Sequence, residues 1–200
     1  KQIALYGPVT VAQEVDIDYS ASVEGIIIPA AWVQSAVALY KTHAEELAVY
    51  EDAPRILGLD VADGGGDMTV LVHRAGPLVL RVDERDQVEP NTAKTTRWAD
   101  KLAQMHGCSL LLYDSIGVGA GIRGELWSLG KERDLGYLQR PVNVGMAPSD
   151  RPMFGVERPR DMFANSKAEL WWSLRARFER THLFVTGEMP GADLDTLIAL

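Results

Sequence analysis

Two aspartates stand at the ends of apolar runs, and glycines follow each of them closely. Asp60 closes the run RILGLD ahead of Gly64–Gly66, and Asp114 closes SLLLYD ahead of a second glycine-rich stretch. Carboxylate oxygens are hard ligands that suit Mg²⁺ or Mn²⁺, and these ions suit phosphate substrates. A site that holds two such ions activates water and stabilises a leaving oxygen. We therefore predict that Asp60 and Asp114 bind metal; the alternative is that each only caps a turn.

Further polar residues are candidates around this pair. Asp67 follows the first glycine turn and is predicted as an accessory catalytic ligand. The most basic region lies late in the chain, where Lys167, Arg158 and Arg160 are predicted to contact nucleic acid. Acidic residues are interspersed among these cations, so a solvated, salt-bridged face is an equally good interpretation.

Gly119, Gly121 and Gly124 match the spacing GxGxxG between an expected strand and an expected helix. That spacing is typical of dinucleotide-binding turns. The alternative is that the glycines let the backbone approach a phosphate or metal closely. The four scattered histidines show no spacing typical of zinc ligands, and the single cysteine, Cys108, excludes an intrachain disulfide.

The hydrophobic pattern predicts the elements that position these residues. A helix is expected from Pro29 to about Val49, with an apolar stripe of Trp32, Val33, Ala36, Val37 and Tyr40. Another is expected from about Asp161 to Arg180, with a buried stripe of Phe163, Leu170, Leu174 and Phe178. Between them we expect, in order, strands at 55–61, 68–74 and 78–83, a helix from 91 or 92 to 106, a strand at 109–114, a helix at 119–129 and a strand at 140–144.

This order predicts an α/β fold with a mixed sheet. The first three strands are joined by short turns and should form an antiparallel meander, whereas helical crossovers should add parallel strands. Neighbouring strands lie about 4.8 Å apart. If the strand ending at Asp114 runs parallel to the strand ending at Asp60, both carboxylates reach one edge of the sheet.

Composition limits the functional classes. Apolar residues make up 46% and charged residues 24% of the 200 residues, as in ordinary globular domains. The net charge of −8 opposes tight, autonomous binding to a polyanion unless a local basic patch exists. No apolar run approaches the roughly 20 residues of a membrane span, and no signal peptide opens the chain, so a cytoplasmic protein is expected.

Three segments together resemble a known family. LGLDVADGGGDMTVLV, LLYDSIGVGAGI and MFANSKAELWWSLRARF are similar, in this order, to the C-terminal nuclease domain of bacteriophage terminase large subunits. EGIIIPAAWVQSAV resembles the segment that joins this nuclease domain to a packaging ATPase. The resemblance implies a ribonuclease H-like fold over residues 55–200 and a linker with a leading helix over residues 1–54.

The resemblance also implies an activity. Such a domain is expected to be a Mg²⁺- or Mn²⁺-dependent endonuclease with a two-metal site, which cuts concatemeric double-stranded viral DNA in the cytoplasm of the bacterial host. The family's acids map onto Asp60, Asp114 and Asp67. The implied partners are the ATPase domain of the same polypeptide, the terminase small subunit and the portal.

One family motif is missing from the chain. The third principal acid of the family lies in a late Pro-Asp-x-x-Asp-Ala-Leu segment, which has no match before Leu200. Asp195 is a possible substitute with a different spacing. We therefore expect a domain truncated at its C-terminal end, whose activity as a fragment is weak or absent.

Two other functions remain open from the sequence. One is a fragment of a phosphotransferase or ATPase of the actin and sugar-kinase superfamily, which has a related fold. The other is a DNA-docking module without catalysis, because the third acid is missing. The Walker motif GxxxxGK[ST] is absent from these 200 residues.

Overall fold

The chain divides into two compact units. The computed structural model describes residues 26–62, 66–86, 91–153, 158–189, 191, 193–194 and 197. One unit consists of residues 45–146, and the other combines residues 1–44 with residues 147–200. Among the described residues, no helix has the length and apolar character needed to cross a lipid bilayer.

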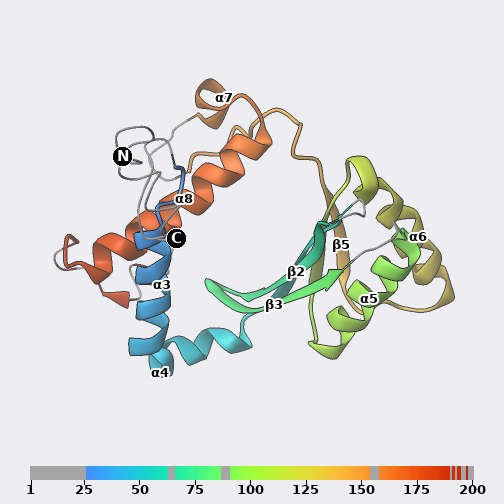
Figure 1. Cartoon of the computed structure of the whole chain (residues 1–200), viewed down its shortest axis with the longest axis horizontal. Coiled ribbons are helices and arrows are strands. Elements are labelled where there is room, and N and C mark those ends of the chain that lie inside the picture. Colours follow the sequence, from blue (N-terminus) through green and yellow to red (C-terminus); the bar gives the residue numbers. More distant parts are fainter. Residues whose placement is uncertain are drawn as a thin grey trace, which may run out of the picture. The chain divides into compact units, whose positions relative to one another are not determined.

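The unit of residues 45–146 is built on a five-stranded sheet (Figure 1). The strand order is β3-β2-β1-β4-β5, in which the first three strands are antiparallel neighbours and β4 and β5 run parallel to β1. The strands are β1 Arg55–Asp60, β2 Met68–Ala75, β3 Leu78–Asp86, β4 Leu110–Asp114 and β5 Leu138–Val142. The predicted mixed sheet, a three-strand meander extended by parallel strands, is confirmed.

Strand β5 differs from its prediction by two residues, since it begins at Leu138 rather than at residue 140. Leu138 pairs with Leu110 of β4, and this register fixes the strand. Pro141 lies within β5 and lacks a backbone donor. It is tolerated because β5 is an edge strand.

Two helices cover one face of the sheet, α5 Thr92–Met105 and α6 Ala120–Glu132 (Figure 1). Leu57, Leu71 and Leu111 alternate onto this face and are fully buried together with Ile122 and Leu126 of α6. Burying each such side chain contributes about 1.5–3 kcal/mol. In β4 only alternate residues are fully buried, so one face of this strand meets the core.

Local interactions set the ends of α5 as predicted. The Asn91 side chain accepts a hydrogen bond from the backbone N–H of Lys94 at 2.9 Å and caps the helix. Gly107 follows with φ of 60°, a conformation that suits glycine at a helix end. A short α4, Ala44–Leu47, and a 3-10 helix, Ala48–Asp52, precede β1.

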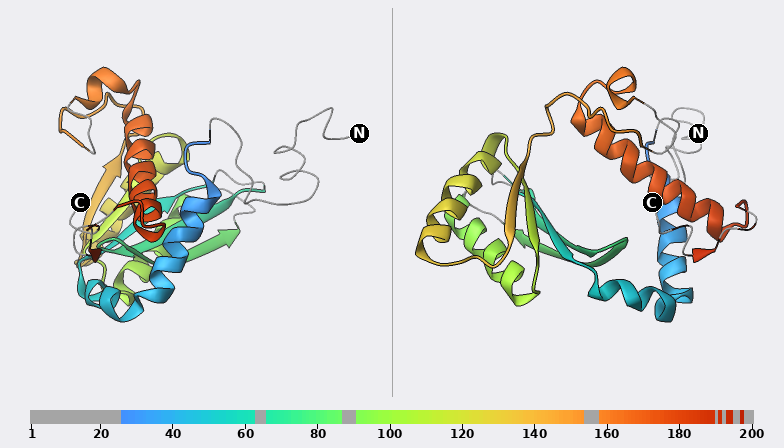
Figure 2. Two further views of the ribbon diagram at one scale, coloured as in Figure 1. Left: turned by 90° about the vertical axis from the view of Figure 1, so that its left-hand side faces the viewer. Right: turned by 180° about the vertical axis from the view of Figure 1, so that it is seen from behind.

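The other unit contains α3 Ala30–Thr42, α7 Pro159–Met162 and α8 Ser166–Val185. Helices α3 and α8 pack together, as the view from behind in Figure 2 shows. Ser35 Oγ lies 2.8 Å from His182 Nδ1, and the His182 ring stacks on Trp32.

The predicted helix from Pro29 to Val49 is wrong in its extent. It ends at Thr42, whose hydroxyl donates to the Ala38 and Leu39 carbonyls and competes with the backbone ladder. Its expected stripe is only partly correct, since Trp32 and Ala36 are half-buried. Val33, Val37 and Tyr40 are exposed, and Leu39 is buried instead.

The predicted helix Asp161–Arg180 is displaced toward the C-terminus. Asn165 accepts a hydrogen bond from the Ala168 N–H at 3.0 Å, so α8 begins only at Ser166. Its expected stripe does not form a buried face in the structure, because Leu170 and Leu174 are exposed.

Candidate metal-binding edge of the sheet

Asp60 and Asp114 reach the same edge of the sheet. Strands β1 and β4 pair in parallel, and the last paired residues are Leu59 and Tyr113. Asp60 and Asp114 are the next residues on each strand. Because neighbouring strands lie about 4.8 Å apart, the two residues stand side by side.

Both carboxylates also belong to the same face of the sheet. Leu59 and Tyr113 are buried toward α5 and α6, and side chains alternate along a strand. The next residues, Asp60 and Asp114, therefore project to the opposite face. Asp60 is exposed and Asp114 is half-buried, so solvent and ligands have access to them.

The chain that leaves Asp60 is held by a residue that the sequence analysis missed. Thr69 is completely buried, and its hydroxyl oxygen accepts a hydrogen bond from the Ala62 N–H at 3.1 Å. This bond ties the exit from β1 to the start of β2 across the glycine turn. In the sequence, a threonine at this place indicates only an ordinary strand residue. Its position after the turn was the only feature that could have pointed to this hydrogen bond.

Asp114 does cap a turn, as the alternative interpretation proposed. Its Oδ1 accepts a hydrogen bond from the Ile116 N–H at 2.9 Å. A carboxylate offers about four acceptor positions, so this bond leaves most of them available. The turn therefore orients the carboxylate and is compatible with metal binding.

The glycines after Asp114 serve the packing of the fold. A Cβ at Gly119 would lie 2.1 Å from the Asp114 carbonyl oxygen, and one at Gly121 would lie 2.9 Å from Thr92 Cγ2. A Cβ at Gly124 would meet open space. These contacts explain two of the three glycines without a ligand, so the spacing GxGxxG does not favour a dinucleotide site.

Asp67 lies at the same edge, directly before β2, and is exposed. It does not complete a three-ligand cluster with the pair. Across the ranges that the structure describes, no three His, Cys, Asp or Glu side chains lie close enough to share a metal ion. Asp195, the possible substitute for the third acid, falls outside the described residues.

The predicted nucleic-acid contacts belong to the other unit, and two of them are paired. Arg158 Nε lies 3.3 Å from Asp161, and Arg160 Nη2 lies 2.7 Å from Asp150. Lys167 is exposed in the first turn of α8. The salt-bridged interpretation therefore describes both arginines.

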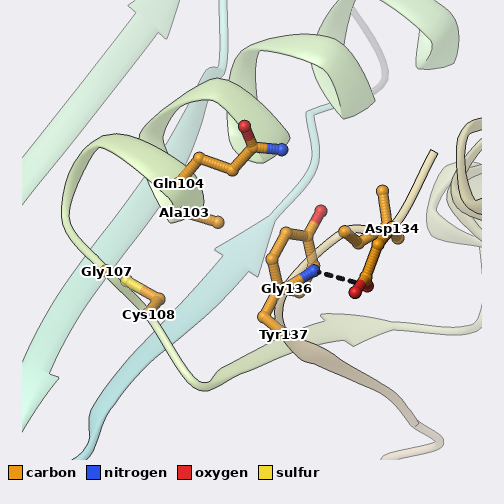
Figure 3. Close-up of a pocket in the computed structure, with 8 residues that line it drawn as sticks. Ala103, Gln104, Gly107, Cys108, Asp134, Gly136 and Tyr137 are labelled. Carbon is orange, nitrogen blue, oxygen red and sulfur yellow. Dashed lines mark hydrogen bonds between the residues drawn. The ribbon is translucent and has the colours of Figure 1, made fainter.

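A cavity of about 390 Å³ lies elsewhere in the sheet unit (Figure 3). Its lining includes Gly107 and Cys108, which precede β4, and Asp134 to Tyr137, which precede β5. It therefore lies at the edge opposite the two aspartates. Burial raises the pKa of the Cys108 thiol, which makes it a poor nucleophile.

Comparisons with known proteins identify the fold. No protein-family model and no curated protein matches the chain. Among solved structures, the nuclease domain of the large terminase subunit gp2 of bacterial virus Sf6 is similar at 25% identity and a TM-score of 0.69, covering 85% of this chain and 71% of that one. A mutant of that domain with manganese and beta-thujaplicinol matches at 25% identity and a TM-score of 0.70, with the same coverage of both chains. A mutant with calcium matches at 24% identity and a TM-score of 0.70, again with the same coverage.

These matches confirm two of the sequence-based predictions. The chain has the ribonuclease H-like mixed sheet of a terminase nuclease domain, and the resemblance to that family is confirmed. The similarity supports a nuclease of the phage terminase kind, and two of these similar structures were solved with a divalent metal ion, manganese or calcium.

Proposed function

We propose that this chain carries the metal-dependent DNA endonuclease site of a phage terminase large subunit. One observation supports this most strongly: Asp60 and Asp114 end parallel neighbouring strands and share one face of the sheet edge. The chain also resembles nuclease domains that were solved with manganese or calcium. In this proposal the substrate is concatemeric double-stranded viral DNA.

The donor set fits Mg²⁺ or Mn²⁺, because both residues offer hard carboxylate oxygens. Two such ions, when bound, activate a water molecule and stabilise the leaving oxygen of the phosphodiester. In this chain the Ile116 N–H fixes Asp114 Oδ1, and Thr69 holds the segment that follows Asp60. The Asp114 carboxylate and the backbone after Asp60 are thus fixed before a ligand arrives, which reduces the cost of assembling the site.

The remaining parts of the proposal rest on the family resemblance. Residues 1–54 would form the linker and leading helix after an ATPase domain, and residues 55–200 the nuclease domain. The proposed partners are that ATPase domain, the terminase small subunit and the portal, in the cytoplasm of an infected bacterium. Asp67 is proposed as an accessory ligand, and Lys167, Arg158 and Arg160 as DNA contacts.

Plasmid nicking by the full-length parent protein with Mn²⁺ or Mg²⁺ tests this function. Asp60→Asn and Asp114→Asn should each reduce the nicking rate by at least about 100-fold, the scale of losing a group that stabilises the transition state. Asparagine retains the Oδ1 acceptor that caps the turn at Asp114, so the variant separates metal binding from turn formation. Asp86→Asn is a matched control at the end of β3 and should nick normally.

A second candidate is a DNA-docking module without catalysis. The observation that favours it is that the described residues hold no cluster of three potential ligands. This candidate predicts duplex binding without any Mn²⁺ binding. The similarity to nuclease domains favours the endonuclease over the sugar-kinase alternative as well; nucleotide-dependent thermal stabilisation would argue for the kinase.

A further inference from the structure

The outer face of the helical layer carries cations at helical spacing. On α5 the cations stand at positions i, i+3 and i+7, and on α6 two cations flank a tryptophan at i, i+4 and i+8. All six side chains are exposed. We call them the helix-layer face: Lys94, Arg97, Lys101, Arg123, Trp127 and Lys131.

This face points away from the sheet. Ala99 and Leu102 of α5 and Ile122 and Leu126 of α6 are buried in the core, so the opposite sides of both helices meet solvent. Figure 1 shows the two helices on the same side of the sheet.

The cations of the helix-layer face are unpaired. None of the five forms an ion pair with a described residue, in contrast to Arg81, Arg133, Arg158 and Arg160, which all do. The acid nearest them along α5, Asp100, is buried and is bound by Arg133. In a chain of net charge −8, five cations without an ion pair among the described residues therefore share this layer, where α6 also carries the half-buried Glu125 and the exposed Glu132. Such segregation is the electrostatic footprint of a polyanion-binding surface.

The face begins at the edge of the sheet that carries the two aspartates, although their carboxylates project from the other side of the sheet. Helix α6 follows the end of β4, and Gly121 in its first turn packs against Thr92, the first residue of α5. Both helices therefore start at the edge where Asp60 and Asp114 lie. The first cation of each helix, Lys94 or Arg123, stands in its first turn.

The dimensions match a nucleic-acid backbone. At 1.5 Å per residue, Lys94 to Lys101 spans roughly 10 Å and Arg123 to Lys131 roughly 12 Å. Phosphates advance by about 3.4 Å along each strand of a duplex, so each row covers about three of them. The Trp127 ring is 61% exposed, and Lys131 Nζ lies 3.7 Å from its centroid, which restrains this cation.

We propose that the helix-layer face binds the phosphate backbone of double-stranded DNA. This inference extends the proposed function by naming a surface that holds the duplex, on the side of the sheet opposite to the two carboxylates. The binding itself requires no metal, so it can be tested separately from the nuclease activity. Because the protein would bind phosphates, binding should be independent of base sequence and strongly dependent on salt.

Fluorescence anisotropy of a labelled duplex, with the full-length parent protein in EDTA over a series of NaCl concentrations, tests the proposal. The variant K94Q/R97Q/K101Q/R123Q/K131Q should bind at least about 10-fold more weakly at low salt. Its plot of log K against log salt should be shallower by about 0.9 for each phosphate that the variant no longer neutralises.

Two controls make the result specific. The swap K94R/R97K/K101R/R123K/K131R preserves every charge and should retain the parent affinity and salt dependence. Lys41→Gln with Arg74→Gln removes two exposed cations from other surfaces and should change the slope little. Thermal melting of each variant identifies any loss of folding. If the glutamine variant does not fold, the charge-preserving swap still tests whether the charges of the helix-layer face determine the affinity for duplex.

The outcomes separate this inference from the proposed function. Weaker, less salt-dependent binding in the glutamine variant, with normal binding in the swap, supports it whether or not the protein nicks DNA. Equal binding by the glutamine variant and the parent overturns it, as does failure of the parent to bind duplex. Tighter binding to single strands that is abolished in Trp127→Ala also overturns it, because base stacking rather than duplex phosphates would then carry the affinity.

Discussion

Two sets of carboxylates in the sheet unit differ in what occupies their oxygens. Asp100 lies on the buried side of α5, where Oδ1 accepts hydrogen bonds from Tyr137 at 2.8 Å and Gln104 at 3.2 Å and Oδ2 pairs with Arg133. Asp114 receives one backbone bond, and Asp60 is exposed at the end of its strand. Asp100 has protein partners on both oxygens and is nearly completely buried, whereas the edge pair keeps acceptors accessible to a ligand.

This difference separates a structural acid from a candidate ligand. A buried charge requires internal partners, because desolvation is costly without them. A metal ligand needs the reverse, a fixed orientation with unfilled lone pairs. Burial and hydrogen bonding thus distinguish aspartates that look alike in the sequence.

The largest effect on stability is expected at Asp100, because both of its carboxylate oxygens have protein partners. Asp100→Ala removes the charged acceptor of Tyr137 and Gln104, whose hydrogen bonds contribute about 1.5–3 kcal/mol each. It also removes the partner of Arg133, which is 39% exposed and regains water. Urea denaturation followed by circular dichroism measures the free energy of unfolding. Asp60→Ala should change that free energy by less than about 0.5 kcal/mol. Similar losses of unfolding free energy in Asp100→Ala and Asp60→Ala would contradict the distinction between the buried aspartate and the aspartates at the edge of the sheet.

The next effect is expected where the backbone crowds Asp114. In Gly119→Ala the new methyl would lie 2.1 Å from the Asp114 carbonyl oxygen, so the turn must move. Overpacking of this kind costs about 1–3 kcal/mol. Gly124→Ala is the matched control, because a methyl there meets open space and alanine favours the helix. Equal melting temperatures for the two variants would contradict the packing role of Gly119.

Thr69→Val should have a smaller effect on stability that extends to the metal edge. It leaves the buried Ala62 N–H without its acceptor, which costs about 1–3 kcal/mol. Because this bond holds the chain after Asp60, Mn²⁺ affinity should fall as well. Thr69→Ser retains the hydroxyl and should bind Mn²⁺ as the parent does. Parent affinity in Thr69→Val would show that Asp60 is held by other contacts.

The smallest effect is expected from a second interior set, His73 and Asp83, whose side chains lie 3.0 Å apart. Burial, reinforced by His106, lowers the pKa of His73 in the folded protein. The unfolded chain therefore binds the proton more readily, and stability is lost as pH falls below about 6.5 toward the folded pKa. The slope cannot exceed about 1.4 kcal/mol per pH unit for one proton.

Urea denaturation between pH 7.5 and 5 measures this dependence. His73→Gln should flatten the curve in that range. An equally steep decline in the variant would assign the pH dependence to another group.

The sequence predicted those parts of the site that depend on local pattern. Apolar runs ending at Asp60 and Asp114, with short turns and one crossover, were enough to place both carboxylates at one edge. Thr69 could not be recognised, because its role depends on a hydrogen bond across the turn. Asp100 could not be either, since its partners Arg133 and Tyr137 are 33 and 37 residues away in the sequence.

The cations of α5 and α6 were not recognised in the sequence for a similar reason. Arg158 and Arg160 stand in the most basic stretch of the sequence, but folding pairs them with Asp161 and Asp150. The cations of α5 and α6 are spread over two helices far apart in the sequence, so only the folded layer shows them as one face. Local charge density is thus a poor guide to which cations remain free.

Calorimetric titration with Mn²⁺ tests the central claim most directly. The full-length parent protein and Asp86→Asn should show the same binding heat, whereas Asp60→Asn and Asp114→Asn should each weaken binding at least about 10-fold, and the double variant should show none. Unchanged Mn²⁺ affinity in the double variant would contradict the assignment of the metal site to this edge of the sheet.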